Sequence, residues 1–314
     1  MVDNFHDETV VHFRGIEVFD DDVMLVTFPK CGTTVRCPRP CQSLSLGSLG
    51  PIAAAQRAVA CTAQWVWKIL HSLLRMDDAG ALPPEGKFNS EEDFQQYWDF
   101  LPLEPPPPEK DDDGNEKPPG FCAQDLLDQP SPRLFSTHMP PRMLPDALKA
   151  TGKMIYVLRN PKDAQVSLHY MGGPPDDGWD GSFERLMNPR SPQVYGTMAA
   201  HILETERYIE EHLGDRAMVV TYEQLTEDLE GMLGRLAEFL GVSLPEGKLE
   251  KVKERVAFST MSNLDGAVGN MLTRKGETGD WRNHFTVNQA AAFDEYWKSA
   301  TAGSSLAAQI KLDT

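Results

Sequence analysis

Four short apolar runs alternate with amphipathic segments along the chain, and this order predicts a mixed α/β fold. The runs are rich in Val, Ile, Leu, Tyr and Phe, which favours buried strands. We predict strands at residues 23–28, 133–138, 153–158 and 217–222. Since helical patterns separate these strands, the sheet is expected to be mostly parallel, with helices on both faces.

The helices are predicted from apolar spacing and from capping residues. Trp65 begins an amphipathic segment, Asn160 caps a helix that starts with Pro161, and Ser243 with Glu246 forms a capping box. The residues around Val10 predict a short strand or a lead-in segment. The predicted helices are 65–75, 90–100, 141–150, one from Pro161, 191–213, 226–240, one from the capping box to Val256, and 287–298.

The turn after the first strand has the composition of a phosphate cradle. It reads Pro29, Lys30, Cys31, Gly32, Thr33 and Thr34. Backbone N–H groups of such a turn bind an anion if a helix follows at once. It is not a Walker A loop, because the lysine precedes the glycine. A core strand followed by a solvated lysine is the alternative.

The ends of the predicted strands indicate where a ligand binds. Parallel sheets bind ligands at the carboxyl ends of their strands. These ends carry residues 29–34, His138, Arg159 and Tyr222, which should therefore share one edge.

Composition excludes several classes of partner. The chain has 314 residues and a net charge of −17, which argues against nucleic acid and anionic membranes. No run of 18 apolar residues and no secretory pattern at the N-terminus are present, so a cytoplasmic location is expected. The five cysteines are odd in number and lack a CxxC pair, which predicts neither a disulfide framework nor a metal site.

Four motifs together resemble the cytosolic sulfotransferases. TFPKCGTT, PRLFSTHMPP, KMIYVLRNPKDAQVS and the RKG of RKGETGDWRNHFT follow one another in the order of that family, from about Asp20 to Lys298. The resemblance implies one domain over residues 1–314 with a P-loop-like sulfotransferase fold. It also implies transfer of a sulfuryl group from 3′-phosphoadenylyl sulfate (PAPS) to a hydroxyl or amine of a small acceptor, without a metal.

Roles for individual residues follow from the same resemblance. His138 is the expected base, and Lys30 stabilises the leaving phosphate, which Cys31, Gly32, Thr33 and Thr34 wrap. Ser136 stands where many members carry a lysine. The other residues expected to contact PAPS are Trp65 on the adenine, Tyr222 and Phe258 beside it, and Arg159, Ser167, Arg274, Lys275 and Gly276 at the 3′-phosphate.

Residues 35–64 interrupt the resemblance. In the family a tryptophan follows the second threonine directly, and removal of this stretch restores GTTW with Trp65. The stretch begins with Val35, whose codons start with GT, and ends with Gln64, which CAG encodes. We hypothesise that it is an in-frame intron that was not removed; a genuine surface insertion is the alternative.

The acceptor pocket and the oligomeric state are predicted from separate stretches of the chain. Residues 104–120 are rich in proline and acid, which predicts a flexible loop. With 98–104 and 170–179 it should line an acceptor pocket that suits an apolar or aromatic molecule. The family's dimerisation stretch is only partly present, so a monomer or weak homodimer is expected.

Two other functions stay open. A catalytically impaired nucleotide-binding homologue is the first, because residues 35–64 separate the phosphate loop from its helix. A nucleotide kinase is the second, and the absent GK[S/T] disfavours it.

Overall fold

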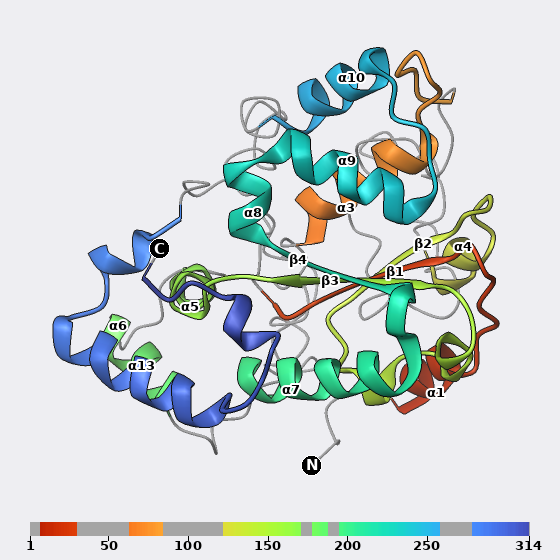
Figure 1. Cartoon of the computed structure of the whole chain (residues 1–314). Coiled ribbons are helices and arrows are strands. Elements are labelled where there is room, and N and C mark those ends of the chain that lie inside the picture. The colour runs from red at the N-terminus through yellow and green to blue at the C-terminus, as the bar shows by residue number, and fades with distance from the viewer. Residues whose placement is uncertain are drawn as a thin grey trace, which may run out of the picture.

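The fold is built on a four-stranded parallel sheet in the order β2-β1-β3-β4 (Figure 1). The structure is a computed structural model that describes residues 7–29, 63–83, 122–170, 178–187, 195–257 and 278–313. The strands are β1 (Val23–Thr27), β2 (Leu134–Thr137), β3 (Lys153–Leu158) and β4 (Ala217–Thr221). The expected single α/β domain with a parallel sheet is thus confirmed, and each predicted strand is found within one residue at either end.

Both faces of the sheet are covered by helices, as the uninterrupted apolar runs require. On one face, Val23 and Leu25 of β1 pack against α3 (Ala63–Arg75) and α9 (Leu229–Leu240). On the other face, Met24 and Val26 belong to the core that includes α7 (Met198–Tyr208) and α13 (Val287–Ala300). Figure 1 shows these two layers above and below the strands.

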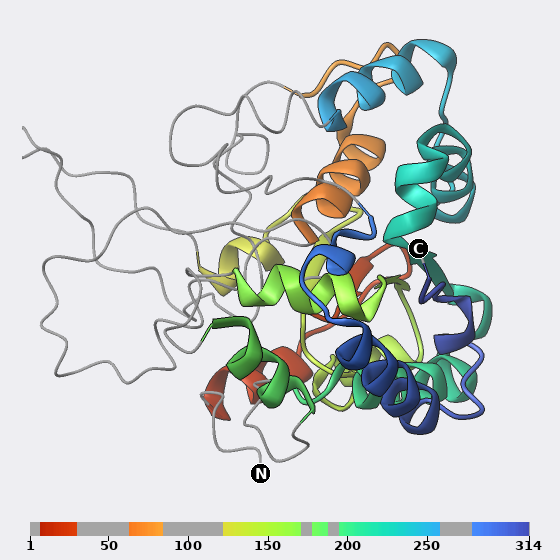
Figure 2. The same cartoon turned by 90° about the vertical axis from the view of Figure 1, so that its left-hand side faces the viewer.

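Helix α5 (Pro161–His169) lies at the carboxyl edge of the sheet, directly after β3. Figure 2 looks onto this edge, with α5 between α3 above and α13 below. Asn160 caps α5 as predicted, because its side chain accepts hydrogen bonds from Lys162 N and Asp163 N. The other helices are α4 (Ala123–Leu127), α6 (Gly178–Met187), α8 (Tyr222–Glu227) and α10 (Glu246–Val256).

Two segments of the N-terminal half have a different secondary structure from the one predicted. Residues around Val10 form helix α1 (Asp7–Arg14) rather than a strand or an irregular lead-in. Val10 and Phe13 turn inward three residues apart, while Val11 is 68% exposed, so the pattern is helical. The predicted helix at 141–150 is instead two 3₁₀ turns, Pro141–Met143 and Asp146–Lys149, because Leu144, which precedes Pro145, is extended and Pro145 itself is not helical.

Three predicted helices have different boundaries. Helix α7 begins at Met198 with Thr197 as its cap, whereas the predicted cap Ser191 lies outside the described residues; after Tyr208 the helix continues as a π-helix at Ile209–Leu213. The predicted helix at 226–240 is broken at Asp228, which leaves helical geometry and caps α9 through Gly231 N. In α10 the N-cap is Pro245 with no side-chain bond, so Ser243 forms no capping box.

Several predictions lie outside the described residues. They are the helix at 90–100, the loop at 104–120 and most of the stretch at 35–64. Short 3₁₀ turns complete the described chain at Gly214–Arg216, Asp280–Asn283 and Ala307–Gln309.

Candidate functional site

The carboxyl edge of the sheet gathers three of the predicted site residues. His138, Arg159 and Tyr222 each follow the last residue of a strand, and all strands are parallel. Their predicted arrangement at one edge is therefore confirmed. The edge also receives Trp65, which comes from the first turns of the described α3.

Trp65, Tyr222 and Arg159 form one cluster. The rings of Trp65 and Tyr222 meet edge to face, with centroids 5.5 Å apart. The guanidinium carbon of Arg159 lies 4.6 Å from the centre of the Tyr222 ring, a cation–π distance. Trp65 Nε1 donates to the Val256 carbonyl at 2.9 Å, which joins α3 to the end of α10. The cluster offers aromatic surface for a base and a buried cation for an anion.

His138 is held in one tautomer by the backbone of β1. Its Nδ1 lies 2.7 Å from the carbonyl oxygen of Thr27. A carbonyl only accepts, so Nδ1 carries the proton and the neutral ring keeps its lone pair on Nε2. The side chain is buried, and the Tyr195 ring meets it edge to face at 5.6 Å. The arrangement suits proton uptake at Nε2.

A second buried histidine lies close to the first. His201 Nε2 lies 3.2 Å from the His138 carbonyl oxygen, and its Nδ1 lies 2.8 Å from the Tyr156 hydroxyl. Burial lowers the pKa of His201 to about 3. Both of its nitrogens are engaged and the ring is neutral near pH 7, so His201 is unsuited to act as the base.

The first turn of α5 anchors the chain that follows the predicted RKG motif. Asp163 is buried, and its carboxylate accepts from Gly279 N at 2.6 Å and from Trp281 N at 2.9 Å. The Lys162 ammonium lies 3.6 Å from the centre of the Trp281 ring and 2.9 Å from Asp294 Oδ1. Ser167, which the sequence predicts to contact the 3′-phosphate of PAPS, is buried on the same helix.

Asn160 ties further segments to this helix start. Its backbone N–H donates to Glu223 Oε1 at 2.9 Å, and burial raises the pKa of the Glu223 carboxyl. Its side-chain amide donates to the carbonyl oxygens of Lys311 and Leu312. The start of α5 therefore joins β4–α8 and the last described residues at the edge of the sheet.

The remaining predicted site residues are outside the described part of the chain. These are Lys30, Cys31, Gly32, Thr33, Thr34, Phe258, Arg274, Lys275 and Gly276. Described residues do flank them: Pro29 precedes the phosphate loop, and Ala257 precedes Phe258.

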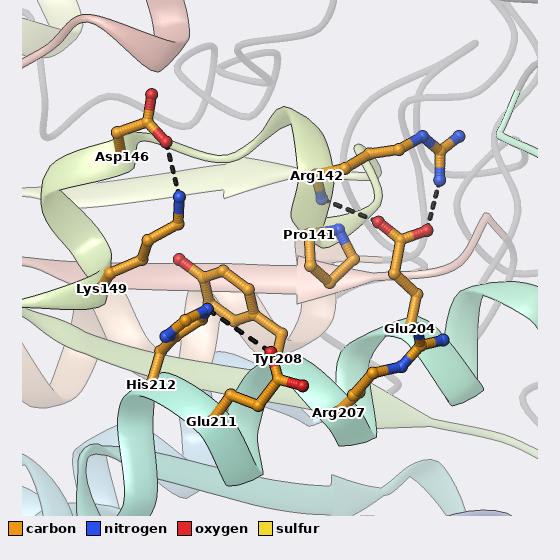
Figure 3. A pocket seen from close by; sticks show the side chains of 9 residues that line it. All are labelled: Pro141, Arg142, Asp146, Lys149, Glu204, Arg207, Tyr208, Glu211 and His212. Carbon is orange, nitrogen blue, oxygen red and sulfur yellow. Dashed lines mark hydrogen bonds and ion pairs between the residues drawn. The ribbon is translucent and has the colours of Figure 1, made fainter.

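A surface pocket of about 250 Å³ lies elsewhere and contains none of the predicted residues (Figure 3). Its charges are largely paired: Arg142 with Glu204, Lys149 with Asp146 at 2.7 Å, and His212 with Glu211 at 3.8 Å. Because these pairs already neutralise one another, the pocket lacks the excess of positive charge that a nucleotide phosphate needs.

Sequence reasoning missed the residues that hold the site in place. His201, Tyr156 and Asp163 are buried polar side chains inside otherwise regular elements. Hydrophobic periodicity does not mark them, because it records which positions turn inward and not which polar groups meet there. The one available signal was the motif KMIYVLRNPKDAQVS, which contains Tyr156 and Asp163.

Among the described residues, no group of three His, Cys, Asp or Glu side chains is arranged for a metal ion. Cys122 is buried with a free thiol, and the other four cysteines lie outside the described ranges. A search of the same residues finds no helix with the length and hydropathy to span a membrane.

Comparison with known proteins gives consistent matches. The family model described as "Sulfotransferase domain" matches residues 20–305. Sulfotransferase 2B1 of Mus musculus is 38% identical over an alignment of 200 residues, which covers 58% of this chain and 57% of that protein. Sulfotransferase 6B1 of Danio rerio is 26% identical over an alignment of 316 residues with gaps, which covers 98% of this chain and 87% of that protein. The match to the mouse relative thus spans less than two thirds of that relative's length.

Solved structures show the same fold. Mouse sulfotransferase SULT7A1 complexed with PAP has a TM-score of 0.64 at 21% identity, covering 98% of this chain and 94% of that chain. Retinol dehydratase in complex with androsterone and inactive cofactor PAP has a TM-score of 0.58 at 18% identity, covering 95% of this chain and 85% of the other. Because the family model spans most of its length, the chain belongs to the sulfotransferase family.

Proposed function

We propose that the protein transfers a sulfuryl group from PAPS to a hydroxyl or amine of a small acceptor. The observation that carries this proposal is His138, whose Nδ1–H is bound to the Thr27 carbonyl at the strand edge where Trp65, Tyr222 and Arg159 gather. The proposed base and the proposed nucleotide-binding surface both lie at the carboxyl edge of a parallel sheet, where ligands of such sheets bind. Family membership supports the same reaction.

In the proposed reaction His138 takes the acceptor proton at Nε2. The acceptor atom forms its bond to sulfur as the bond from sulfur to the 5′-phosphate oxygen breaks. The leaving phosphate takes up negative charge, which Lys30 and the amides of Cys31–Thr34 would stabilise. Such reactions depend mainly on positioning and electrostatic stabilisation.

Donor recognition is assigned to the described cluster and its flanking motifs. Trp65 and Tyr222 would contact the adenine, with Phe258 beside them. Arg159 and Ser167 would bind the 3′-phosphate together with Arg274, Lys275 and Gly276. Two similar folds were solved with PAP, which supports an adenosine 3′-phosphate donor.

Ser136 is a departure from the family pattern with a local consequence. Strand alternation places its side chain on the α3 face, as for Leu134. Its hydroxyl is buried and has no hydrogen-bond partner among the described residues. Ser136 supplies no positive charge where many family members carry a lysine, which is expected to slow transfer rather than abolish it.

A small apolar or aromatic acceptor and a cytoplasmic location complete the proposal. A solved relative of this fold contains androsterone, a molecule of that acceptor type. Residues 98–104 and 170–179 would line its pocket.

The test is transfer from PAPS to a panel of phenols, hydroxysteroids and aromatic amines in the presence of a metal chelator, followed by mass spectrometry. The proposal predicts sulfated product without added metal. Phosphoryl transfer from ATP with Mg²⁺ instead would indicate a kinase. Absence of transfer together with native binding of adenosine 3′,5′-bisphosphate (PAP) would indicate the impaired nucleotide-binding homologue.

A further inference from the structure

His201 occupies a position behind His138 that neither the sequence motifs nor the family match assigns to a function. It lies on α7 and is 1% exposed. Its ring stacks on the Tyr156 ring at an interplanar angle of 11°, and the Phe28 ring meets it edge to face at 5.7 Å. These contacts leave the imidazole one orientation.

The hydrogen bonds of His201 also determine its tautomer. The His138 carbonyl oxygen can only accept, so His201 Nε2 carries the proton and donates it at 3.2 Å. The neutral ring therefore accepts at Nδ1, and the Tyr156 hydroxyl donates to it at 2.8 Å. A directed chain of hydrogen bonds runs from Tyr156 in β3 through His201 in α7 to the main chain of His138.

His138 is thereby held at two points. The Thr27 carbonyl holds its side chain, and His201 holds its carbonyl group. With the peptide plane and the ring both fixed, Nε2 of His138 keeps one direction at the strand edge. A preorganised base avoids reorientation during the proton transfer.

We propose that His201 is a positioning residue: by holding the main-chain carbonyl of His138 it keeps the ring within hydrogen-bond reach of the Thr27 carbonyl, in the Nδ1–H tautomer, with Nε2 directed at the acceptor. This inference rests on the proposed function, in which His138 is the base. The low pKa of His201, caused first by burial, supports it because a neutral His201 places no positive charge beside the base. Electrostatic interactions with His138 and with Arg142 lower the pKa of His201 further.

The experiment uses the full chain with ¹⁵N-labelled histidine, and NMR reports the tautomer of each ring. The test variant is the double substitution Tyr156→Phe with His201→Phe, which keeps two stacked rings and removes the bond to the His138 carbonyl. Tyr156→Phe alone is the matched control, because it leaves the bond from His201 to His138 in place. Calorimetric binding of PAP to each variant reports whether the donor site is intact.

In the native chain and in the control, nearly all neutral His138 should carry its proton on Nδ1. In the double variant the His138 main chain is no longer held and the ring loses its fixed distance to the Thr27 carbonyl, so that fraction should fall to about half, with PAP affinity within about twofold of native. An unchanged His138 tautomer in a double variant that binds PAP natively would overturn the inference. If His201 of the native chain carries its proton on Nδ1, that result would also overturn the inference. Failure of the native chain to bind PAP would count against the proposed function instead, since the tautomer measurement needs no ligand.

Should the double variant fail to fold, His201→Gln replaces it. Glutamine can donate to the His138 carbonyl and accept from Tyr156, so it should preserve the His138 tautomer. His201→Leu, which can do neither, should disturb it. Equal His138 spectra in these two variants would contradict the inference as well.

Discussion

Two buried histidines lie one hydrogen bond apart, and their surroundings give them different proton chemistry. His138 bonds the Thr27 carbonyl through Nδ1, so the neutral ring carries its lone pair on Nε2. His201 uses both nitrogens, toward Tyr156 and the His138 carbonyl, and its pKa is lowered to about 3. Position at the strand edge, rather than residue type alone, thus distinguishes the candidate base.

Replacement of the base should separate catalysis from donor binding. His138→Gln is predicted to lower the turnover of any acceptor found in the panel by about 10² to 10⁴, because general-base catalysis contributes that much. PAP affinity should change little. His212→Gln is the control, since His212 is a partly exposed histidine that pairs with Glu211. Near-native turnover in His138→Gln would exclude His138 as the base.

His201 also predicts how folding stability depends on pH. The unfolded chain takes up a proton on this residue near pH 6.5, whereas the folded chain resists it until about pH 3. Stability from this group is therefore lost as the pH falls from about 6.5 toward 3. Between pH 7 and pH 5 the loss is about 2 kcal/mol.

Urea unfolding at pH 7 and pH 5 measures this loss. The native chain is compared with His201→Gln, which has no titrating ring and should show a correspondingly smaller decrease in the free energy of unfolding. The same decrease in both proteins would show that other groups cause the acid sensitivity.

At the scale of elements, the start of α5 joins segments that are distant in the sequence. Asn160 bonds Glu223 and the carbonyl oxygens of Lys311 and Leu312, and Asp163 bonds the backbone of Gly279 and Trp281. Helix α5 also follows Arg159 and carries Ser167. One helix therefore organises both described residues that are proposed to bind the 3′-phosphate.

Asp163→Asn tests the strength of this anchor. Asparagine keeps one acceptor oxygen and turns an N–H group toward the second backbone donor, so a buried charge-assisted bond is lost. The free energy of unfolding should fall by about 2 to 3 kcal/mol. Asp228→Asn is the matched control, because among the described residues the Asp228 carboxylate accepts one hydrogen bond, from Gly231 N at an exposed N-cap, where asparagine serves equally well. Equal losses in both variants would contradict the special role of Asp163.

The strands and the Asn160 cap could be predicted because each depends on local pattern. Leu134 and Lys153 begin strands within one residue of the predicted starts, since buried parallel strands read as continuous apolar runs. The break that Asp228 makes in the predicted helix at 226–240 could not be predicted. An aspartate caps a helix only where the fold turns the chain at that residue, and the local sequence does not show where that happens. The links from Asp163 to Gly279 and from His201 to His138 join positions far apart in the sequence, and only the fold brings them together.

For the whole molecule, the stretch at residues 35–64 bears most on activity. Ala63 and Gln64 are the first two residues of the described α3 and directly precede Trp65. Removing residues 35–64 would place Thr33 and Thr34 at those two helical positions. The phosphate loop would then lead straight into the helix start, where backbone amides and the helix dipole favour an anion.

The shortened chain should therefore bind PAP about tenfold more tightly than the full chain. Calorimetry of both chains measures this, with circular dichroism to check that each is folded. Equal affinities would mean that the stretch leaves the donor site intact. Sequencing the transcript is the matching test of the intron hypothesis: a message that retains the corresponding 90 nucleotides in most copies contradicts it.

The central claim is that the carboxyl edge of the sheet binds an adenosine nucleotide through its 3′-phosphate, and that Arg159 is one of the residues that bind this phosphate. Calorimetry with PAP and with adenosine 5′-monophosphate, on the native chain and on Arg159→Met, tests it most directly. The native chain should prefer PAP by about 10- to 100-fold, as expected for charge-assisted bonds to a phosphate, and Arg159→Met should lose about tenfold of that preference. Equal binding of both nucleotides, or no binding of either, would contradict the account.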